Sequence, residues 1–98
     1  MVMLILANPM TIYVGNISYS LGEEEIRKIF EVMGTVDSVK LILDKRSGRS
    51  KGYCFIEMLD QKEAMEAIKT LDGKEVAGRN LRVIKSHSTK RVREDSSV

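Results

Sequence analysis

The sequence predicts an α+β domain in which two helices cover one face of a four-stranded antiparallel sheet. Four segments combine branched and aromatic residues with the alternation of strands, and two others repeat apolar residues at helical spacing. Their order along the chain is strand, helix, strand, strand, helix, strand. Each helix has a single apolar stripe that must be buried on the sheet, and right-handed crossovers place both helices on the same face.

The composition agrees with one globular domain. The chain has 98 residues, of which 43% are apolar and 31% are charged. Its longest apolar run, residues 2–7, is far shorter than the roughly 20 residues that a membrane-spanning helix needs. The run also lacks the basic residues and the cleavage site of a secretory signal. We therefore expect an intracellular protein, cytoplasmic in a bacterium and nuclear or organellar in a eukaryote.

The first strand and the first helix are predicted from residues 11 to 34. Residues 11–16 alternate between apolar and other side chains, as a half-buried strand does. Ser20 and Glu23 have the spacing of a capping box, so the helix is predicted to begin after Ser20. Its apolar stripe lies at positions 26, 29, 30 and 33. Gly34 is predicted to end the helix in the left-handed conformation.

The second and third strands are predicted at residues 36–43 and 51–58. The loop between them, residues 44–50, contains Asp, Ser and Gly, which favour turns. The two strands therefore form a hairpin with a long loop.

The second helix is predicted to begin at the N-cap Asp60, with Glu63 three residues later, and to end at Asp72-Gly73. Its apolar stripe lies at positions 64, 67, 68 and 71. Residues 75–76 are predicted to form a short strand before a turn at Ala77-Gly78. The last strand is predicted at residues 79–85, with Leu81 and Val83 on one side.

The face of the sheet away from the helices is predicted to carry three aromatic rings. Alternation along the first strand turns Tyr13 outward, and alternation along the third strand turns Tyr53 and Phe55 to the same side. An exposed ring can stack on an unpaired base, which contributes roughly 1–3 kcal/mol. The same alternation turns Gly15 and Glu57 outward and turns Ile12, Val14, Cys54, Ile56 and Met58 inward.

The charge distribution is more informative than the net charge of +2. Basic residues gather at positions 40–51 and 79–93, whereas acids gather at 23–31 and 63–66. This polarity fits an anion-binding surface backed by an acidic one, and chance clustering on a solvated surface fits it equally well. The basic side chains that we predict to contact phosphates are Lys40, Arg49, Lys51, Arg82 and Lys85.

The residues offer little for catalysis or metal binding. A single cysteine, Cys54, cannot form an internal disulfide, and one thiol with one histidine, His87, cannot build a zinc site. Cys54 lies in an apolar strand, where we expect a buried, inert thiol. Glu63 and Glu66 are expected to lie on a solvated helix surface. We therefore predict no enzyme activity, no catalytic residue, no metal and no cofactor.

Two segments resemble the paired motifs of the RNA recognition motif family. Lys51-Gly52-Tyr53-Cys54-Phe55-Ile56-Glu57-Met58 resembles its ribonucleoprotein octamer, and Ile12-Tyr13-Val14-Gly15-Asn16-Ile17 resembles its companion hexamer. The resemblance covers residues 11–85, and the chain is also similar to the compact single-motif RNA-binding proteins of bacteria and organelles. Cys54 departs from the usual Gly or Ala, and Met58 from the usual final aromatic residue; both departures concern packing.

The resemblance implies a ferredoxin-like βαββαβ fold that binds single-stranded RNA across its open sheet face. The stacking positions of the family fall on Tyr13, Tyr53 and Phe55, and its basic octamer position falls on Lys51. Asn16, within the hexamer, is included among the predicted RNA contacts. Two alternatives remain at this stage: a protein-interaction module with the same fold, and a general binder of single-stranded nucleic acid that includes DNA.

The two ends of the chain lie outside the predicted domain of residues 11–85. Residues 1–10 form an N-terminal extension, which either precedes a natural start at Met10 or packs against the sheet or a second copy. We expect a monomer, with self-association through residues 1–9 as the alternative. Residues 86–98 form a basic and then acidic tail, which either adds phosphate contacts or only solubilises the chain.

Overall fold

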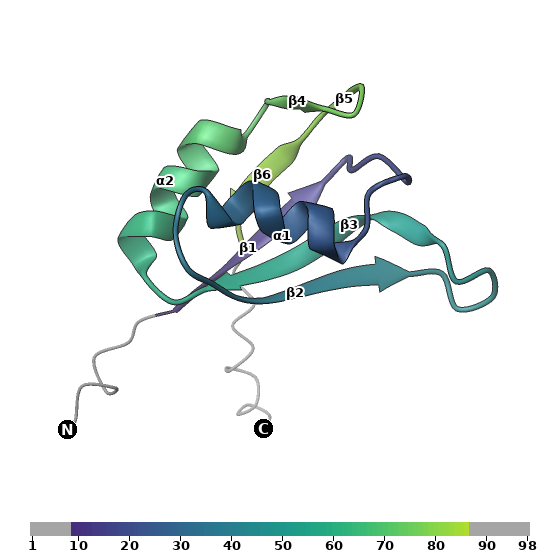
Figure 1. The fold of residues 1–98 in the computed structure, drawn as a ribbon, viewed down its shortest axis with the longest axis horizontal. Helices are drawn as coiled ribbons and strands as arrows, with labels where there is room; N and C mark the ends of the chain where they lie inside the picture. Colours follow the sequence, from purple (N-terminus) through teal and green to yellow (C-terminus); the bar gives the residue numbers. More distant parts are fainter. Residues whose placement is uncertain (1–8, 87–98) are drawn as a thin grey trace.

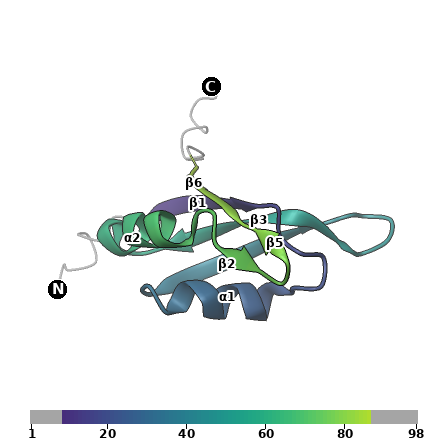
Figure 2. The same cartoon turned by 90° about the horizontal axis from the view of Figure 1, so that it is seen from above.

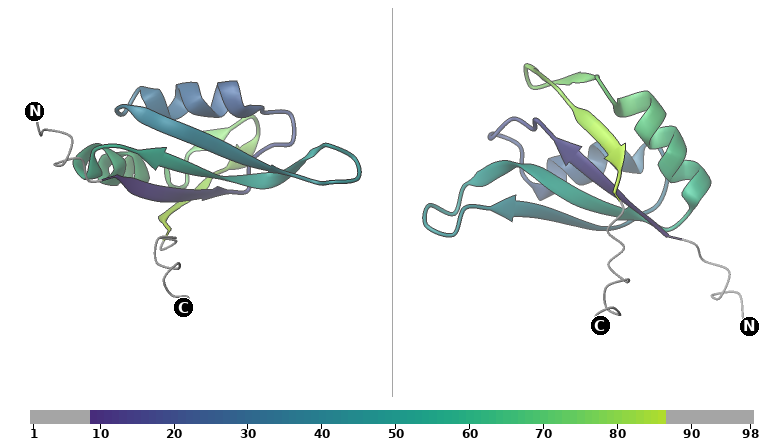
Figure 3. Two further views of the ribbon diagram at one scale, coloured as in Figure 1. Left: turned by 90° about the horizontal axis from the view of Figure 1, so that it is seen from below. Right: turned by 180° about the vertical axis from the view of Figure 1, so that it is seen from behind.

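The computed structural model describes residues 9–86, so the predictions for the N-terminal extension and the tail fall almost entirely outside it. Both helices pack on the same core at one face of the sheet. α1 crosses in front of the strands in Figure 1 and behind them in the reverse view of Figure 3, where α2 lies alongside β6. The opposite face is not covered by any element of the described chain (Figures 2 and 3). The elements are β1 (Met10–Gly15), α1 (Glu23–Glu31), β2 (Val36–Leu43), β3 (Ser50–Met58), α2 (Gln61–Leu71), β4 (Glu75–Val76), β5 (Arg79–Asn80) and β6 (Arg82–Lys85).

The main sheet has the strand order β2-β3-β1-β6, and all its pairs are antiparallel. The predicted fold class is therefore confirmed: two crossovers carry the helices, and β1 and β3 lie side by side in the centre. The two ends of the described chain are also neighbours, because the Ser86 N–H donates to the carbonyl of Thr11 at 2.9 Å.

The core lies between the sheet and the helices. The inward positions predicted for β1 and β3 are all buried, and Phe30 of α1 is completely inaccessible to solvent. Ala64 and Ala67 of α2 are equally buried, and their small side chains let this helix approach the sheet closely. The burial of these apolar side chains is the main source of stability in a small domain.

The N-terminus of α1 differs from the predicted capping box. Gly22 is the N-cap, and its N–H donates to Glu25 Oε1 at 2.8 Å. The prediction that Ser20 and Glu23 form the box is wrong, because the Ser20 hydroxyl lies 2.8 Å from Ser18 Oγ in the preceding turn. Glu23 reaches sideways instead, and its Oε2 accepts a hydrogen bond from the Leu41 N–H of β2 at 3.4 Å.

Gly34 has a different role from the predicted one. It does not have a positive φ angle, and α1 ends at Glu31 with Val32 as a right-handed C-cap. A Cβ atom at Gly34 would lie 2.6 Å from the Cβ of Glu63 on α2. Glu63 Oε1 in turn accepts a hydrogen bond from the Thr35 N–H at 3.0 Å. Gly34 therefore provides room for a carboxylate that joins α2 to the loop between α1 and β2.

The boundaries of α2 agree with the prediction. Asp60 is the N-cap, and its Oδ1 accepts a hydrogen bond from the Lys62 N–H at 2.8 Å. The helix ends before Asp72-Gly73, where Gly73 has a φ of 87°. Asp72 Oδ1 also accepts a hydrogen bond from the Val83 N–H at 2.9 Å, which joins the end of the helix to β6.

The last predicted strand, residues 79–85, is divided into two. β5 pairs with β4 in a separate hairpin, as Glu75↔Asn80 and Val76↔Arg79. Ala77 and Gly78 both have positive φ angles, of 53° and 85°, as a two-residue hairpin turn requires. Leu81 interrupts the strand, and both Leu81 and Val83 are buried as predicted.

Replacement of Gly34 by Ala should destabilise the domain by about 1–3 kcal/mol, because the new methyl group overlaps Glu63 in a packed contact. Urea unfolding followed by circular dichroism measures this change. Thr70→Ala, at an exposed position of α2, is the control and should change the stability by less than about 0.5 kcal/mol. Equal stabilities of the two variants would show that the Gly34–Glu63 contact does not constrain the fold.

The Cys54 thiol should resist alkylation in the folded protein. Burial, with a smaller contribution from Glu23, raises its pKa to about 12, so the thiolate is almost absent near neutral pH. At pH 8 we expect iodoacetamide to modify folded protein at least roughly a thousandfold more slowly than urea-unfolded protein. Mass spectrometry reads the modification directly, because the chain has one cysteine. Comparable rates in the two states would contradict the buried position.

Candidate nucleic-acid interface

The register of β1 and β3 brings the three predicted rings together. Tyr13 lies directly opposite Phe55, and Tyr53 is two residues away on the same face of β3. The ring centroids are 5.8 Å apart for Tyr13 and Phe55, 5.9 Å for Tyr13 and Tyr53, and 6.2 Å for Tyr53 and Phe55. We call these three residues the aromatic cluster. Tilted and edge-to-face contacts at such distances stabilise a ring arrangement by about 0.5–1.5 kcal/mol per pair.

The rings of the aromatic cluster are half-buried, whereas the sequence predicted rings displayed to solvent. Their mutual contacts cover part of each ring. In addition, the Tyr13 side chain lies against Gly15, where a Cβ atom would be 2.9 Å from Tyr13 Cζ. Gly15 therefore faces outward, as predicted, but is buried beneath this ring. The cluster is thus held in place by its own packing before any ligand arrives.

Three of the predicted basic residues lie around the aromatic cluster. Lys40 of β2 is exposed directly opposite Phe55, and Arg82 of β6 is exposed directly opposite Gly15. Lys51 is exposed at the start of β3. Within residues 9–86 the salt bridges are limited to one pair on α1, Arg27 with Glu31, so none of these three cations forms a salt bridge there, although the charge of Lys51 acts on the Asp44 carboxyl. They are available to an anionic ligand.

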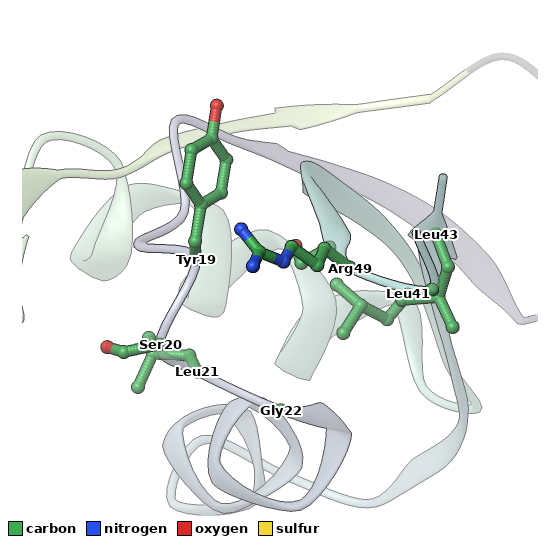
Figure 4. Close-up of a pocket in the computed structure, with 9 residues that line it drawn as sticks. Tyr19, Ser20, Leu21, Gly22, Leu41, Leu43 and Arg49 are labelled. Atoms are coloured by element: carbon green, nitrogen blue, oxygen red, sulfur yellow. The ribbon is translucent and has the colours of Figure 1, made fainter. Parts of the chain in front are cut away.

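The structure does not bring Lys85 and Arg49 to the aromatic cluster. Lys85 pairs with Ile12, whose side chain is in the core, so alternation directs Lys85 toward the helix side of the sheet. Arg49 lies in the β2–β3 loop, and its side chain extends toward Tyr19 (Figure 4). Both residues lie in basic stretches of the sequence, but their orientation depends on the register of β6 and on the course of the β2–β3 loop.

Asn16 has both ends of its side-chain amide engaged. Its Nδ2 donates to the backbone carbonyl of Asn80 at 2.9 Å. Its Oδ1 accepts hydrogen bonds from Arg79, at 2.9 Å from Nη2 and 3.3 Å from Nε. Asn16 has a φ of 57°, which Asn tolerates better than most residues. This side chain therefore fastens the β4–β5 hairpin to the end of β1.

Two planar groups near the start of β3 and the end of β1, Tyr19 and Arg79, were not predicted from the sequence. Tyr19 is 67% exposed, and the Cζ atom of Arg79 lies 5.8 Å from the centroid of its ring, within the range of a cation–π contact. Tyr19 also packs over Gly52, where a Cβ atom would be 3.1 Å from Tyr19 Cε1. An exposed tyrosine in the loop after the hexamer was the available signal. Arg79, which packs against this tyrosine, lies in the β4–β5 hairpin, far along the chain.

The β2–β3 loop is organised by an acidic side chain. The backbone N–H groups of Ser47 and Arg46 donate to Asp44 Oδ1, at 3.2 and 2.8 Å. These bonds, that of Ser47 first, hold the pKa of the Asp44 carboxyl below its ordinary value. The basic side chains of this loop are therefore presented on a folded turn.

Two further findings concern other kinds of site. Residues 9–86 contain no group of three or more His, Cys, Asp or Glu side chains placed to hold a metal ion. No helix in this part of the chain is long and apolar enough to cross a membrane.

Comparisons with known proteins identify relatives of this chain. The profile of the RNA recognition motif family matches residues 12–82. The putative RNA-binding protein RbpB of Nostoc sp. is 44% identical over 77 residues, which are 79% of this chain and 75% of that protein. The human cleavage stimulation factor subunit 2 tau variant is 41% identical over 88 residues, 90% of this chain. The chain spans only 14% of the length of that relative.

Solved structures share the arrangement of strands and helices. The crystal structure of the RNA-binding protein PG1 has 40% sequence identity and a TM-score of 0.77, covering 79% of this chain and 93% of that one. The Rna15 RRM with bound RNA (GU) has 36% identity and a TM-score of 0.72, covering 78% of this chain and 81% of that one.

The family match covers most of the chain, and it includes both central strands and the aromatic cluster that they carry. The sheet order, the two helices on one face and the extensive similarity to RbpB agree with it. The chain belongs to the RNA recognition motif family.

Proposed function

We propose that this chain binds single-stranded RNA across the open face of the sheet, with bases stacked on Tyr13, Tyr53 and Phe55. The observation that supports this proposal best is the aromatic cluster, whose centroids lie 5.8–6.2 Å apart on two adjacent central strands. A flat group can lie on each ring, because the helices cover the other face (Figure 3). The similar Rna15 domain, described with bound RNA, adds support from a relative.

The free energies of base stacking and phosphate contact predict a moderate affinity for RNA. Stacking contributes roughly 1–3 kcal/mol per base, so the aromatic cluster supplies most of the binding energy that a single small domain needs. Lys40, Lys51 and Arg82 flank it and can contact phosphates. A dissociation constant in the micromolar range, about −8 kcal/mol, follows after the cost of ordering the strand is subtracted.

The remaining predicted contacts have other roles in this proposal. Asn16 acts through Arg79, which it holds beside Tyr19, rather than through a contact of its own. Arg49 and Lys85 do not touch the stacked bases. Stacking on rings does not distinguish RNA from single-stranded DNA, since that distinction needs contacts to the 2′-hydroxyl.

Loss of a ring should weaken RNA binding without unfolding the domain. Tyr13→Ala and Phe55→Ala should each raise the dissociation constant for a labelled U-rich octamer by a factor of about 5 to 150, the equivalent of one lost stack. Fluorescence anisotropy measures the affinity, and circular dichroism confirms folding. Met65→Ala, on the exposed surface of α2, is the matched control. Normal binding by both folded ring variants would refute the proposed surface.

Two substitutions on the same strand test the orientation of β6. Arg82→Gln should weaken binding and should lower the dependence of log K on log salt by about 0.7, because one phosphate contact to a single strand is lost. Lys85→Gln removes the same charge from the helix side and should leave both quantities nearly unchanged. The anisotropy titration is repeated at several salt concentrations. If the two variants behave alike, the charges act only through the net field of the domain.

A further inference from the structure

An open groove of about 650 Å³ lies at the end of the sheet where β2 meets the β2–β3 loop. One wall is the β1–α1 loop, residues 19–22, and the other is the end of β2 with the adjoining β2–β3 loop (Figure 4). Leu21, Leu41 and Leu43 give it an aliphatic surface, and Leu43 is 49% exposed. A leucine so exposed at the end of an edge strand is available to a partner.

The groove and the aromatic cluster lie on different sides of the sheet. Leu41 pairs with Cys54, whose side chain is completely buried beneath the helices. Directly paired residues in an antiparallel sheet point to the same face, so Leu41 points toward the helix layer. A base stacked on Tyr13 or Phe55 would therefore lie on the opposite side of the sheet from Leu41.

Arg49 places one positive charge inside this aliphatic surface. Its side chain reaches across the groove toward Tyr19, beside Leu41 (Figure 4). No ion pair or side-chain hydrogen bond of its guanidinium is found among residues 9–86. Asp44 lies across the loop, where its N–H donates to the Arg49 carbonyl at 2.7 Å, but its carboxylate accepts from the N–H groups of Arg46 and Ser47. Glu23 is directed to the Leu41 N–H at 3.4 Å. The guanidinium is thus complementary to a carboxylate of a partner.

We propose that this groove is a docking site for an extended peptide of another protein, in which an aliphatic side chain is followed by an Asp or Glu. The aliphatic side chain would pack among Leu21, Leu41 and Leu43, and the carboxylate would pair with Arg49. β2 is an edge strand of the sheet, so the peptide backbone can run along the part of it that Glu23 does not occupy. A chain of phosphates suits the groove less well than a single carboxylate, because Arg49 is the one cation among the described residues that line it and the leucines beside it are apolar.

The test is an NMR titration of the full chain with a blocked pentapeptide that has two leucines followed by one aspartate. We expect shifts of the backbone amides of Leu41, Leu43 and Arg49, and none at Tyr53 or Phe55. The same peptide with asparagine in place of aspartate should bind about tenfold more weakly, as should the Arg49→Gln variant. Lys45→Gln, in the same loop but outside the groove, is the control and should bind normally.

Three results would overturn the proposal. The first is an absence of shifts at millimolar peptide. The second is equal binding of the aspartate and asparagine peptides, which would leave Arg49 without a role. The third is a U-rich octamer that shifts the groove amides and is displaced by the peptide, which would make the groove part of the RNA surface. Because the ring amides report on RNA separately, this outcome is distinguishable from a failure of RNA binding itself.

Discussion

The antiparallel register between β1 and β3 is the constraint on which the rest of the structure depends. It pairs Ile12 with Ile56 and Tyr13 with Phe55. Because successive side chains in a strand point to opposite faces, this single register buries the first pair and presents the second. A slip of one residue would exchange the two faces, placing hydroxyls in the core and isoleucines in solvent. The requirement for a dry core therefore fixes the positions of the ligand-facing rings as well.

Much of the fold could be predicted from the sequence because it depends on local periodicity. β2 was predicted residue for residue, and the apolar stripes of both helices are the ones that pack on the sheet. The errors concern groups whose partners are distant in sequence. Gly34 was assigned to a helix end by a local rule, yet its neighbour is Glu63 on the other helix. The spacing of Ser20 and Glu23 likewise fits a capping box, but the Ser20 hydroxyl is already hydrogen-bonded to Ser18 in the preceding turn.

In the candidate site, too, the features that depend on a single strand were predicted, and those that depend on distant partners were not. Alternation alone identified the aromatic cluster, since each ring needs only the parity of its own strand. The pairing of Tyr19 with Arg79 depends on a hairpin that folds back and is fastened by Asn16, 63 residues before Arg79. The orientation of Lys85 required the register of β6, which a run of basic residues does not reveal. The half-burial of the rings is a property of their mutual packing, which no single strand contains.

The hydrogen bond from Ser86 to Thr11 has an architectural consequence. It places the first and the last strand of the domain next to each other, so the chain enters and leaves at adjacent points of the sheet. A module with neighbouring ends can be inserted into a longer polypeptide without spreading the host sequence apart. Several such modules can also be strung in series with short linkers. The related human protein, of which the matching stretch is 14%, embeds such a module in a much longer chain.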